Sequence, residues 1–302
     1  MAVSIASASV GAVAAVFRHD MGQARARLAS QPTQLFRSSY GDMQYQVTGE
    51  GVPMLISHGI TGGVDQAESL VTQARTVPSN YRFIYVSRFG YLASALPPAA
   101  TSRTQAAAYR ELLDHLSIER VFLVGNSAGG PSALWFAIDY PQRTQGLILL
   151  SSAVPGPVPD PIPPLVAKHD FIYWAAVKAA PGALLGMFMP KSVLRGMSRQ
   201  DKSEAVRLTL SASMPIFERT EGIRFDNQVT VPGVNDVPFE HVTPPTLIFQ
   251  AVDDPREHAG GQQMAQRIPN ATFVGLTGGH LLHGHQAEIQ ARIAGFVEAN
   301  TS

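Results

Sequence analysis

Patterns of buried strands and amphipathic helices alternate along most of this chain. Short runs rich in apolar residues, the pattern of strands covered on both faces, occur at residues 52–57, 81–86, 121–124, 146–152 and 245–250. Residues 104–116 have helical periodicity instead, with Leu112, Leu113 and Leu116 available for burial. This alternation predicts the α/β class with a mostly parallel, doubly wound sheet. Two short strands at residues 35–37 and 43–47, separated by a turn, are expected to precede it as an antiparallel pair.

The pattern changes after Val154. Residues 155–164 contain six prolines, which exclude a helix or a central strand, and helical patterns follow at residues 171–178, 183–189 and 203–214. We therefore expect a helical lid at residues 155–240, inserted into a core made of residues 34–154 and 241–302. Candidate substrate-binding side chains in this lid are Phe171, Trp174, Met187 and Phe217. As a set they indicate a mostly apolar pocket, although for each of them burial of the lid against the core is the simpler role.

Residues 1–33 form a separate N-terminal segment. Residues 2–17 carry no charge, but this stretch is shorter than the roughly 20 residues that span a membrane, and it lacks the basic start of a signal peptide. We expect a helix that packs on the body or on a second subunit, so that a homodimer through this segment is one expectation. Export or membrane attachment is the alternative to the cytoplasmic location that we otherwise expect.

The composition narrows the choice of partners. The 302 residues include 23 Lys and Arg against 23 Asp and Glu, and this balance gives no support for a nucleic acid or an anionic membrane as a partner. The chain has no cysteine, which excludes disulfides, thiolate chemistry and cysteine-based metal sites. We therefore expect a small-molecule partner.

The stretch VFLVGNSAGG at residues 121–130 carries the most specific chemical signal. An apolar strand runs into Gly-x-Ser-x-Gly, and the apolar residues after it have the pattern of a helix start. In this strand–turn–helix context the serine, Ser127, is a candidate nucleophile on a strained turn, and Gly125 and Gly129 allow the close approach of two backbones. The stretch resembles the nucleophile elbow of the α/β-hydrolase superfamily, in the form found in serine esterase-like members.

The resemblance implies where the remaining catalytic groups lie. A second strand runs into His58-Gly59-Ile60, which resembles the oxyanion-hole loop of the superfamily. The backbone N–H groups of Ile60 and Ala128 are then the expected oxyanion donors, while His58 is expected to hold the loop. By the same resemblance the Asp before a proline after the last strong strand, Asp254, is the triad acid, and the Gly-Gly-His sequence makes His280 the base.

Three histidines within six residues, His280, His283 and His285, also invite a metal site. Their spacing lacks the helical His pair and the Glu of common zinc hydrolases, so we expect no metal and no cofactor. The sequence predicts a serine hydrolase that cleaves a carboxylic ester or lactone through an acyl-enzyme. A carbon–carbon bond hydrolase of the same fold, or a receptor-like protein that binds ligand with little turnover, are the alternatives.

Overall fold

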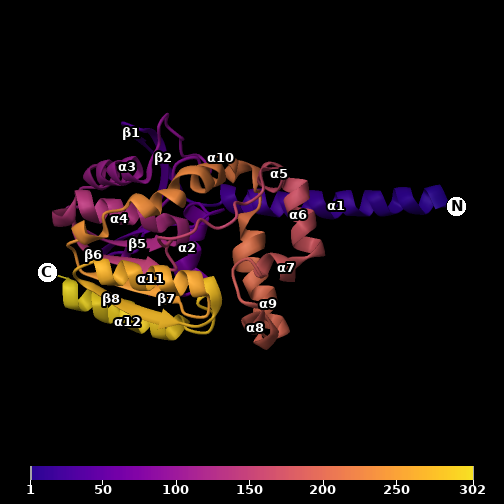
Figure 1. Cartoon of the computed structure of the whole chain (residues 1–302). Coiled ribbons are helices and arrows are strands. Elements are labelled where there is room, and N and C mark those ends of the chain that lie inside the picture. Colours follow the sequence, from indigo (N-terminus) through magenta and orange to yellow (C-terminus); the bar gives the residue numbers. More distant parts are fainter. Residues whose placement is uncertain (1, 302) are drawn as a thin grey trace.

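The computed structural model describes residues 2–301, and their side chains from residue 11 onward. An eight-stranded sheet crosses the molecule in the order β1-β2-β4-β3-β5-β6-β7-β8 (Figure 1). β2 pairs antiparallel with β1 and with β4, and every other pair of neighbouring strands is parallel. The strands are β1 (Gln34–Ser38), β2 (Gly41–Thr48), β3 (Pro53–Ser57), β4 (Arg82–Val86), β5 (Val121–Asn126), β6 (Thr144–Leu150), β7 (Thr246–Ala251) and β8 (Ala271–Leu276). The predicted α/β class, with its mostly parallel sheet, is confirmed.

Helices cover both faces of the sheet because alternate residues of each strand point to opposite sides. On one face α3 (Ser102–His115), α4 (Gly130–Asp139) and α11 (Pro255–Arg267) pack against side chains such as Leu123 and Leu149. On the other face α2 (Val64–Thr72) and α12 (Gln286–Asn300) pack against side chains such as Phe122 and Val124. The strands β3 to β7 are therefore buried on both sides, as their nearly continuous apolar sequences predict, whereas the edge strands β1 and β8 are partly exposed.

A helical insertion connects β6 to β7. Its α-helices are α5 (Pro164–Lys168), α6 (Asp170–Ala179), α7 (Pro181–Leu185), α8 (Lys191–Gly196), α9 (Arg199–Ala205) and α10 (Thr220–Phe225). Its buried side chains, among them Tyr173, Leu185 and Ile223, form an apolar cluster of their own. The lid function expected of residues 155–240 stays a prediction.

Two buried ion pairs fasten the insertion just beyond the carboxyl ends of β3 and β4. Arg88 donates to both carboxylate oxygens of Asp226, and the two side chains are 1% and 0% exposed. Arg219 donates to the carboxylate of Asp65 at 2.8 and 3.1 Å and to the carbonyl of Gly62. Because breaking a buried pair leaves an uncompensated charge, at a cost of about 3–5 kcal/mol, the insertion is held in a defined position over this edge of the sheet.

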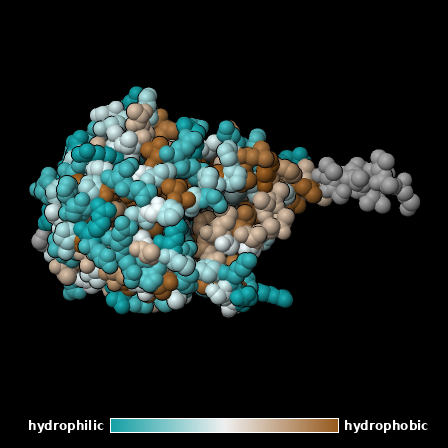
Figure 2. All heavy atoms as spheres, viewed as in Figure 1, coloured by the Kyte–Doolittle hydropathy of each residue, from teal (hydrophilic) through white to brown (hydrophobic). Residues whose placement is uncertain are grey.

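The N-terminal segment forms one continuous helix, α1 (Ala2–Ala29). Its second half packs on the insertion: Met21 is buried, and Asp20 accepts a hydrogen bond from the Trp174 indole and forms an ion pair with Lys178. Its first half projects from the body (Figure 1), and apolar residues gather where it leaves (Figure 2). Among the helices that the structure describes, none combines the length and the apolar character needed to cross a bilayer. The dimer and membrane expectations for this segment stay predictions.

Candidate active site

Ser127 occupies a strained turn between β5 and α4. Its φ angle of +51° lies in the left-handed region, which costs a non-glycine residue about 1–3 kcal/mol. Neighbouring glycines make the turn feasible, since a Cβ on Gly129 would lie 2.1 Å from the Ser57 carbonyl oxygen and one on Gly125 would lie 2.7 Å from the Gly130 Cα. The turn presents the hydroxyl at the carboxyl end of the sheet, where α/β folds bind ligands.

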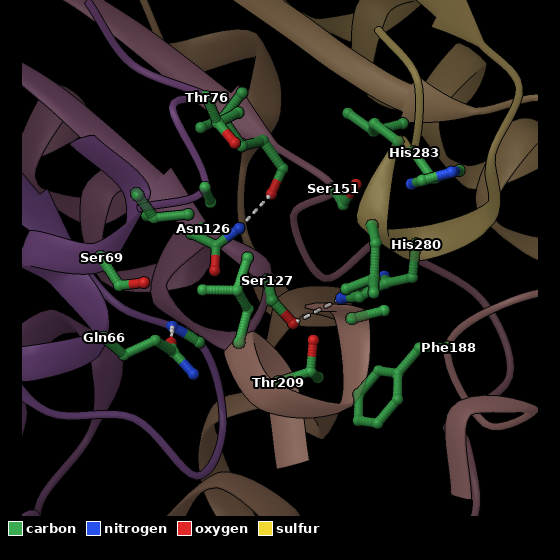
Figure 3. Close-up of a pocket in the computed structure, with 18 of the residues that line it drawn as sticks. Gln66, Ser69, Thr76, Asn126, Ser127, Ser151, Phe188, Thr209, His280 and His283 are labelled. Atoms are coloured by element: carbon green, nitrogen blue, oxygen red, sulfur yellow. Dashed lines mark hydrogen bonds between the residues drawn. The ribbon is translucent and has the colours of Figure 1, made fainter. Parts of the chain in front are cut away.

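His280 reaches Ser127 from the loop after β8. Its Nε2 lies 2.9 Å from the Ser127 Oγ (Figure 3). The loop turns through Gly278 and Gly279, whose φ angles are +97° and +62°, and the Asp253 carboxylate accepts their N–H groups at 2.9 and 3.0 Å. Asp253 therefore fixes the backbone that carries the imidazole.

The carboxylate on the far side of His280 belongs to Glu257, in the first turn of α11. Its Oε1 lies 2.6 Å from His280 Nδ1, and the Glu257 side chain is 4% exposed. The expectation that Asp254 contacts His280 is therefore corrected. Asp254 instead caps α11, because its Oδ1 accepts the N–H groups of Arg256 and Glu257, both at 3.0 Å.

A signal for this correction was present in the sequence. Asp254 is followed directly by Pro255, and Glu257 comes two residues after that proline. An Asp before a proline at the first helical position is typical of a helix start. An Asp engaged as an N-cap points its oxygens at its own helix, and the Glu one turn further on is free to turn toward the sheet. Only the tertiary structure places that Glu beside the histidine.

The charge of Glu257 changes the pKa of His280. Burial lowers the pKa of this imidazole, but the adjacent Glu257 carboxylate raises it by more, so the pKa lies above its ordinary value of 6.5. The second oxygen of Glu257 accepts a hydrogen bond from the buried Gln250 amide at 3.2 Å. Partners on two different elements therefore hold the two carboxylate oxygens of Glu257.

The two expected oxyanion donors lie beside Ser127. Ile60 and Ala128 both line a cavity that also contains Ser127 and His280. The loop that carries Ile60 is held from behind, because the Gln66 side-chain oxygen accepts the Gly59 N–H at 2.8 Å. This arrangement lets two backbone N–H groups converge on a carbonyl oxygen bound at Ser127, and the oxyanion role of each stays a prediction.

His58 lies fully buried within this loop. Its Nδ1 is 2.7 Å from the Gly59 carbonyl oxygen, and its Nε2 accepts the backbone N–H of Arg88 at 3.0 Å. Burial, together with the nearby Arg88 charge, lowers the pKa of His58 well below its ordinary value. A neutral ring whose two nitrogens both bond to backbone groups acts as a brace between the loops after β3 and β4.

The other two histidines of the C-terminal cluster lie outside this relay. His283 lines a cavity next to Ser127, and His285 bonds to the Thr277 hydroxyl at 3.0 Å. Within the part of the chain that the structure describes, no three His, Asp or Glu side chains are arranged to hold a metal ion.

Two cavities open on either side of Ser127 and His280. The first, of about 320 Å³, lies between α2, α9 and the histidine loop (Figure 3). The second, of about 450 Å³, lies between the proline-rich stretch, residues 186–190 and the start of α11. Phe188 lines both cavities and lies against His280, with 6.2 Å between the ring centroids.

The four candidate lid side chains are placed differently from one another. Met187 lines the second cavity. Phe171 and Trp174 pack instead on Phe17 of α1, with ring centroids 5.3 and 5.5 Å from it. Phe217 is 62% exposed and lines neither cavity. The expectation is therefore corrected for Phe171, Trp174 and Phe217, because the N-terminal helix and the outer surface take the apolar faces that the sequence alone would assign to a pocket.

Ser151, directly after β6, is a further polar group in the first cavity. Its φ angle is +44°, it is 1% exposed, and its Oγ has no hydrogen-bond partner among the described residues. A strained backbone and an unpartnered buried hydroxyl are both costly. Both features lie in the cavity beside Ser127.

This architecture defines a family. The chain belongs to the alpha/beta hydrolase fold family, whose sequence model matches residues 52–285. Over 111 residues it is 35% identical to a 2-hydroxy-6-oxo-6-phenylhexa-2,4-dienoate hydrolase of Comamonas testosteroni, a match that covers 36% of this chain and 39% of the relative. The chain spans less than half the length of the first curated relatives it matches.

Solved structures are similar over most of the chain. An alpha/beta hydrolase fold protein from Nakamurella multipartita is 22% identical with a TM-score of 0.73, covering 89% of this chain and 100% of that protein. The enol-lactonase from Burkholderia xenovorans LB400 is 16% identical with a TM-score of 0.62, covering 88% and 100% of the two chains. At these identities the likeness shows the fold alone. The family and the fold establish the chain as an α/β hydrolase, and its substrate is a separate question.

Proposed function

We propose that this protein is a serine hydrolase that cleaves a carboxylic ester or lactone, with Ser127 as nucleophile, His280 as general base and Glu257 as the acid. The observation that carries the proposal is the continuous relay from the Ser127 hydroxyl through His280, at 2.9 Å, to the buried Glu257, at 2.6 Å. Nucleophile, base and orienting carboxylate within hydrogen-bond distance form the arrangement that activates a serine.

The proposed reaction uses the same groups in both of its halves. Ser127 Oγ attacks the carbonyl carbon as His280 Nε2 takes its proton, and Glu257 holds Nδ1–H and stabilises the imidazolium. The N–H groups of Ile60 and Ala128 stabilise the oxyanion. Collapse of the intermediate expels the alcohol, which takes the proton from His280. Water then attacks the acyl-enzyme and gives a proton to His280. The bond between the acyl carbon and Ser127 Oγ breaks, His280 returns the proton to that oxygen, and the acid product leaves.

The two cavities support a substrate with groups on both sides of the scissile bond. One cavity can take the acyl part and the other the alcohol part, or both can take one lactone with its side chain, since each reaches Ser127 and His280. The insertion supplies Phe188 and Met189 to both cavities, which supports its proposed role as a lid. The two buried arginine–aspartate pairs hold the later part of the insertion through Arg219 and Asp226, so opening is expected in the part that precedes them, around residues 181–205.

A carbon–carbon bond hydrolase is the second candidate. The observation that favours it is the 35% identity over 111 residues to the Comamonas testosteroni dienoate hydrolase named above. The unpartnered Ser151 hydroxyl supports it as well, because a substrate with an oxo or hydroxyl group near the scissile bond would use such a partner. Both candidates use the same serine relay, so the substrate has to distinguish them.

Intact mass after reaction with a fluorophosphonate tests the serine. We expect one adduct on the wild-type chain and none on Ser127→Ala or His280→Ala. Turnover of p-nitrophenyl esters and of a γ- or δ-lactone series, compared with a 2-hydroxy-6-oxo-dienoate, then assigns the bond that is cleaved. An unlabelled wild-type chain with no turnover of any of these substrates would contradict the proposal and favour a ligand-binding protein.

A further inference from the structure

A groove lies on the outer side of the helical insertion, away from Ser127. It is bordered by α6, α7, α8 and α9, which lie at the end of the molecule from which α1 projects (Figure 1). Its volume is about 710 Å³, within the range of about 300–1,000 Å³ that is usual for small-molecule sites. Leu185, Leu194 and Val206 contribute apolar walls. None of its lining residues lines either cavity at Ser127, so this groove is a separate site.

The charged side chains along this groove all have one sign. Lys178, Lys191, Arg195 and Lys202 line it, and no Asp or Glu does, although the whole chain has equal numbers of basic and acidic residues. Lys178 pairs with Asp20 of α1 at 2.9 Å. Within residues 11–301, no carboxylate forms an ion pair with any of the other three. Lys191 and Arg195 are exposed and Lys202 is partly exposed, so three cations without an ion-pair partner in this part of the chain stand beside the apolar wall and are accessible to an anion.

The combination specifies the chemistry of a ligand. Apolar walls remove a hydrocarbon chain from water, while ammonium and guanidinium groups at the rim attract an anion through charge-assisted hydrogen bonds. We propose that this groove binds an anionic amphiphile, a carboxylate with a hydrocarbon chain, with its chain along Leu185, Leu194 and Val206 and its head between Lys191 and Arg195.

The groove and the first active-site cavity share one wall, the helix α9. Lys202 and Ser203 face the groove, whereas Asp201 and Glu204 line the cavity next to Ser127. The helix continues into a π-helical turn, Val206–Leu210, a feature that is frequent at functional sites. A ligand that packs on one side of α9 therefore changes the position of the other side. This coupling rests on the proposed function, whereas binding in the groove does not.

Calorimetric titration of the full-length Ser127→Ala chain with decanoate, below the concentration at which it forms micelles, tests binding without turnover. We expect one equivalent to bind, and the matched uncharged probe decan-1-ol to bind about ten-fold more weakly because the head-group attraction is lost. High salt is expected to weaken the binding of decanoate and to leave the binding of decan-1-ol almost unchanged.

A pair of charge-reversal variants locates the site. Lys191→Glu combined with Arg195→Glu is expected to weaken the binding of decanoate about ten-fold or more, since attraction of its carboxylate becomes repulsion. Lys168→Glu combined with Arg199→Glu makes the same change of net charge on the same insertion outside the groove, and it should retain the wild-type affinity. Equal losses in both variants, or no binding of decanoate to the parent chain, would overturn the site.

Two further arms separate the remaining outcomes. In one outcome the chain sediments with phosphatidylglycerol vesicles and not with phosphatidylcholine vesicles, loses this in the groove variant (Lys191→Glu with Arg195→Glu), and binds no decanoate. That result would reassign the groove to a lipid surface and overturn the proposal of a free carboxylate as ligand. On the active chain, decanoate should change the KM for an ester about two-fold or more, and the groove variant should not respond. An unchanged KM with intact binding would overturn the coupling through α9 alone. A chain that fails fluorophosphonate labelling but binds decanoate would contradict the proposed function and leave the groove standing.

Discussion

The position of the acid makes the sharpest test of the site, because two neighbouring carboxylates compete for it. Replacing Glu257 by Gln keeps the size of the side chain and removes its charge. In the structure both of its oxygens face donors: His280 Nδ1 at 2.6 Å and Gln250 Nε2 at 3.2 Å. An amide has only one oxygen, so its NH2 group must oppose one of these two donors. If it turns toward His280, it stabilises the tautomer whose Nε2 carries the proton and cannot take one from Ser127.

The size of the effect follows from this geometry. Loss of the carboxylate in a serine triad costs about 10⁴-fold in rate when the wrong histidine tautomer results, which corresponds to about 5.4 kcal/mol in the activation free energy. We therefore expect Glu257→Gln to lower kcat/KM for a p-nitrophenyl ester by about 10³- to 10⁴-fold. In the pH profile of the variant's remaining activity, the acidic limb should move to lower pH, because the charge of Glu257 raises the pKa of His280 in the wild type.

Asp254→Asn is the matched control. Asn is as good an N-cap as Asp, so the start of α11 should persist and kcat/KM should change by less than about ten-fold. The assay is steady-state hydrolysis of the ester by both variants, with thermal melts to establish that each is folded. Near-normal activity in Glu257→Gln together with a thousand-fold loss in Asp254→Asn would refute the reasoning and return the acid to Asp254.

Three other predictions address the charge of His280, the anchoring of the insertion and the backbone of the elbow. Since the pKa of His280 is raised above 6.5, kcat/KM of the wild type should fall as pH drops, with a midpoint above that value; a flat profile through this range would contradict the neutral base. Burial raises the pKa of Asp65, but Arg219 and Arg27 lower it by more. The ionised Asp65 therefore contributes its full share to the stability of the fold at pH values above its unfolded pKa of 3.8, and this contribution is lost as the pH falls toward its lower pKa in the folded chain. At neutral pH Asp65→Asn should cost about 3 kcal/mol of unfolding free energy, measured by urea denaturation, and a loss below about 1 kcal/mol would show that the pairs do not anchor the insertion. Gly129→Ala should prevent folding of the elbow, because its Cβ would lie 2.1 Å from a backbone oxygen, whereas Gly22→Ala, with nothing within 4 Å, should be neutral or slightly stabilising. Equal soluble yields and melting temperatures for these two variants would contradict the packing at the elbow.

Local patterns were enough to predict the sheet and the elbow. Strands such as β5 and β6 are almost continuously apolar, and a strand covered on both faces has few other sequences available to it. The strained φ of Ser127 was predictable too, because Gly-x-Ser-x-Gly between a strand and a helix leaves little choice of backbone path. These features depend on residues within about ten positions of one another along the chain, the scale over which strand and helix periodicity are expressed.

Contacts between distant segments were decided only by the tertiary structure. Glu257 and Asp254 are three residues apart, and which of them meets His280 depends on how α11 is rotated against β7 and β8. Phe171 and Trp174 are apolar in any arrangement, but the docking of α1 turns them toward Phe17 and away from the substrate cavities. The sequence by itself thus determined the strands, the nucleophile turn and the chemical types present. Side-chain partners remained open, because hydrophobic burial has no direction, and only the packed chain decides which of several suitable groups lies within 3 Å of another.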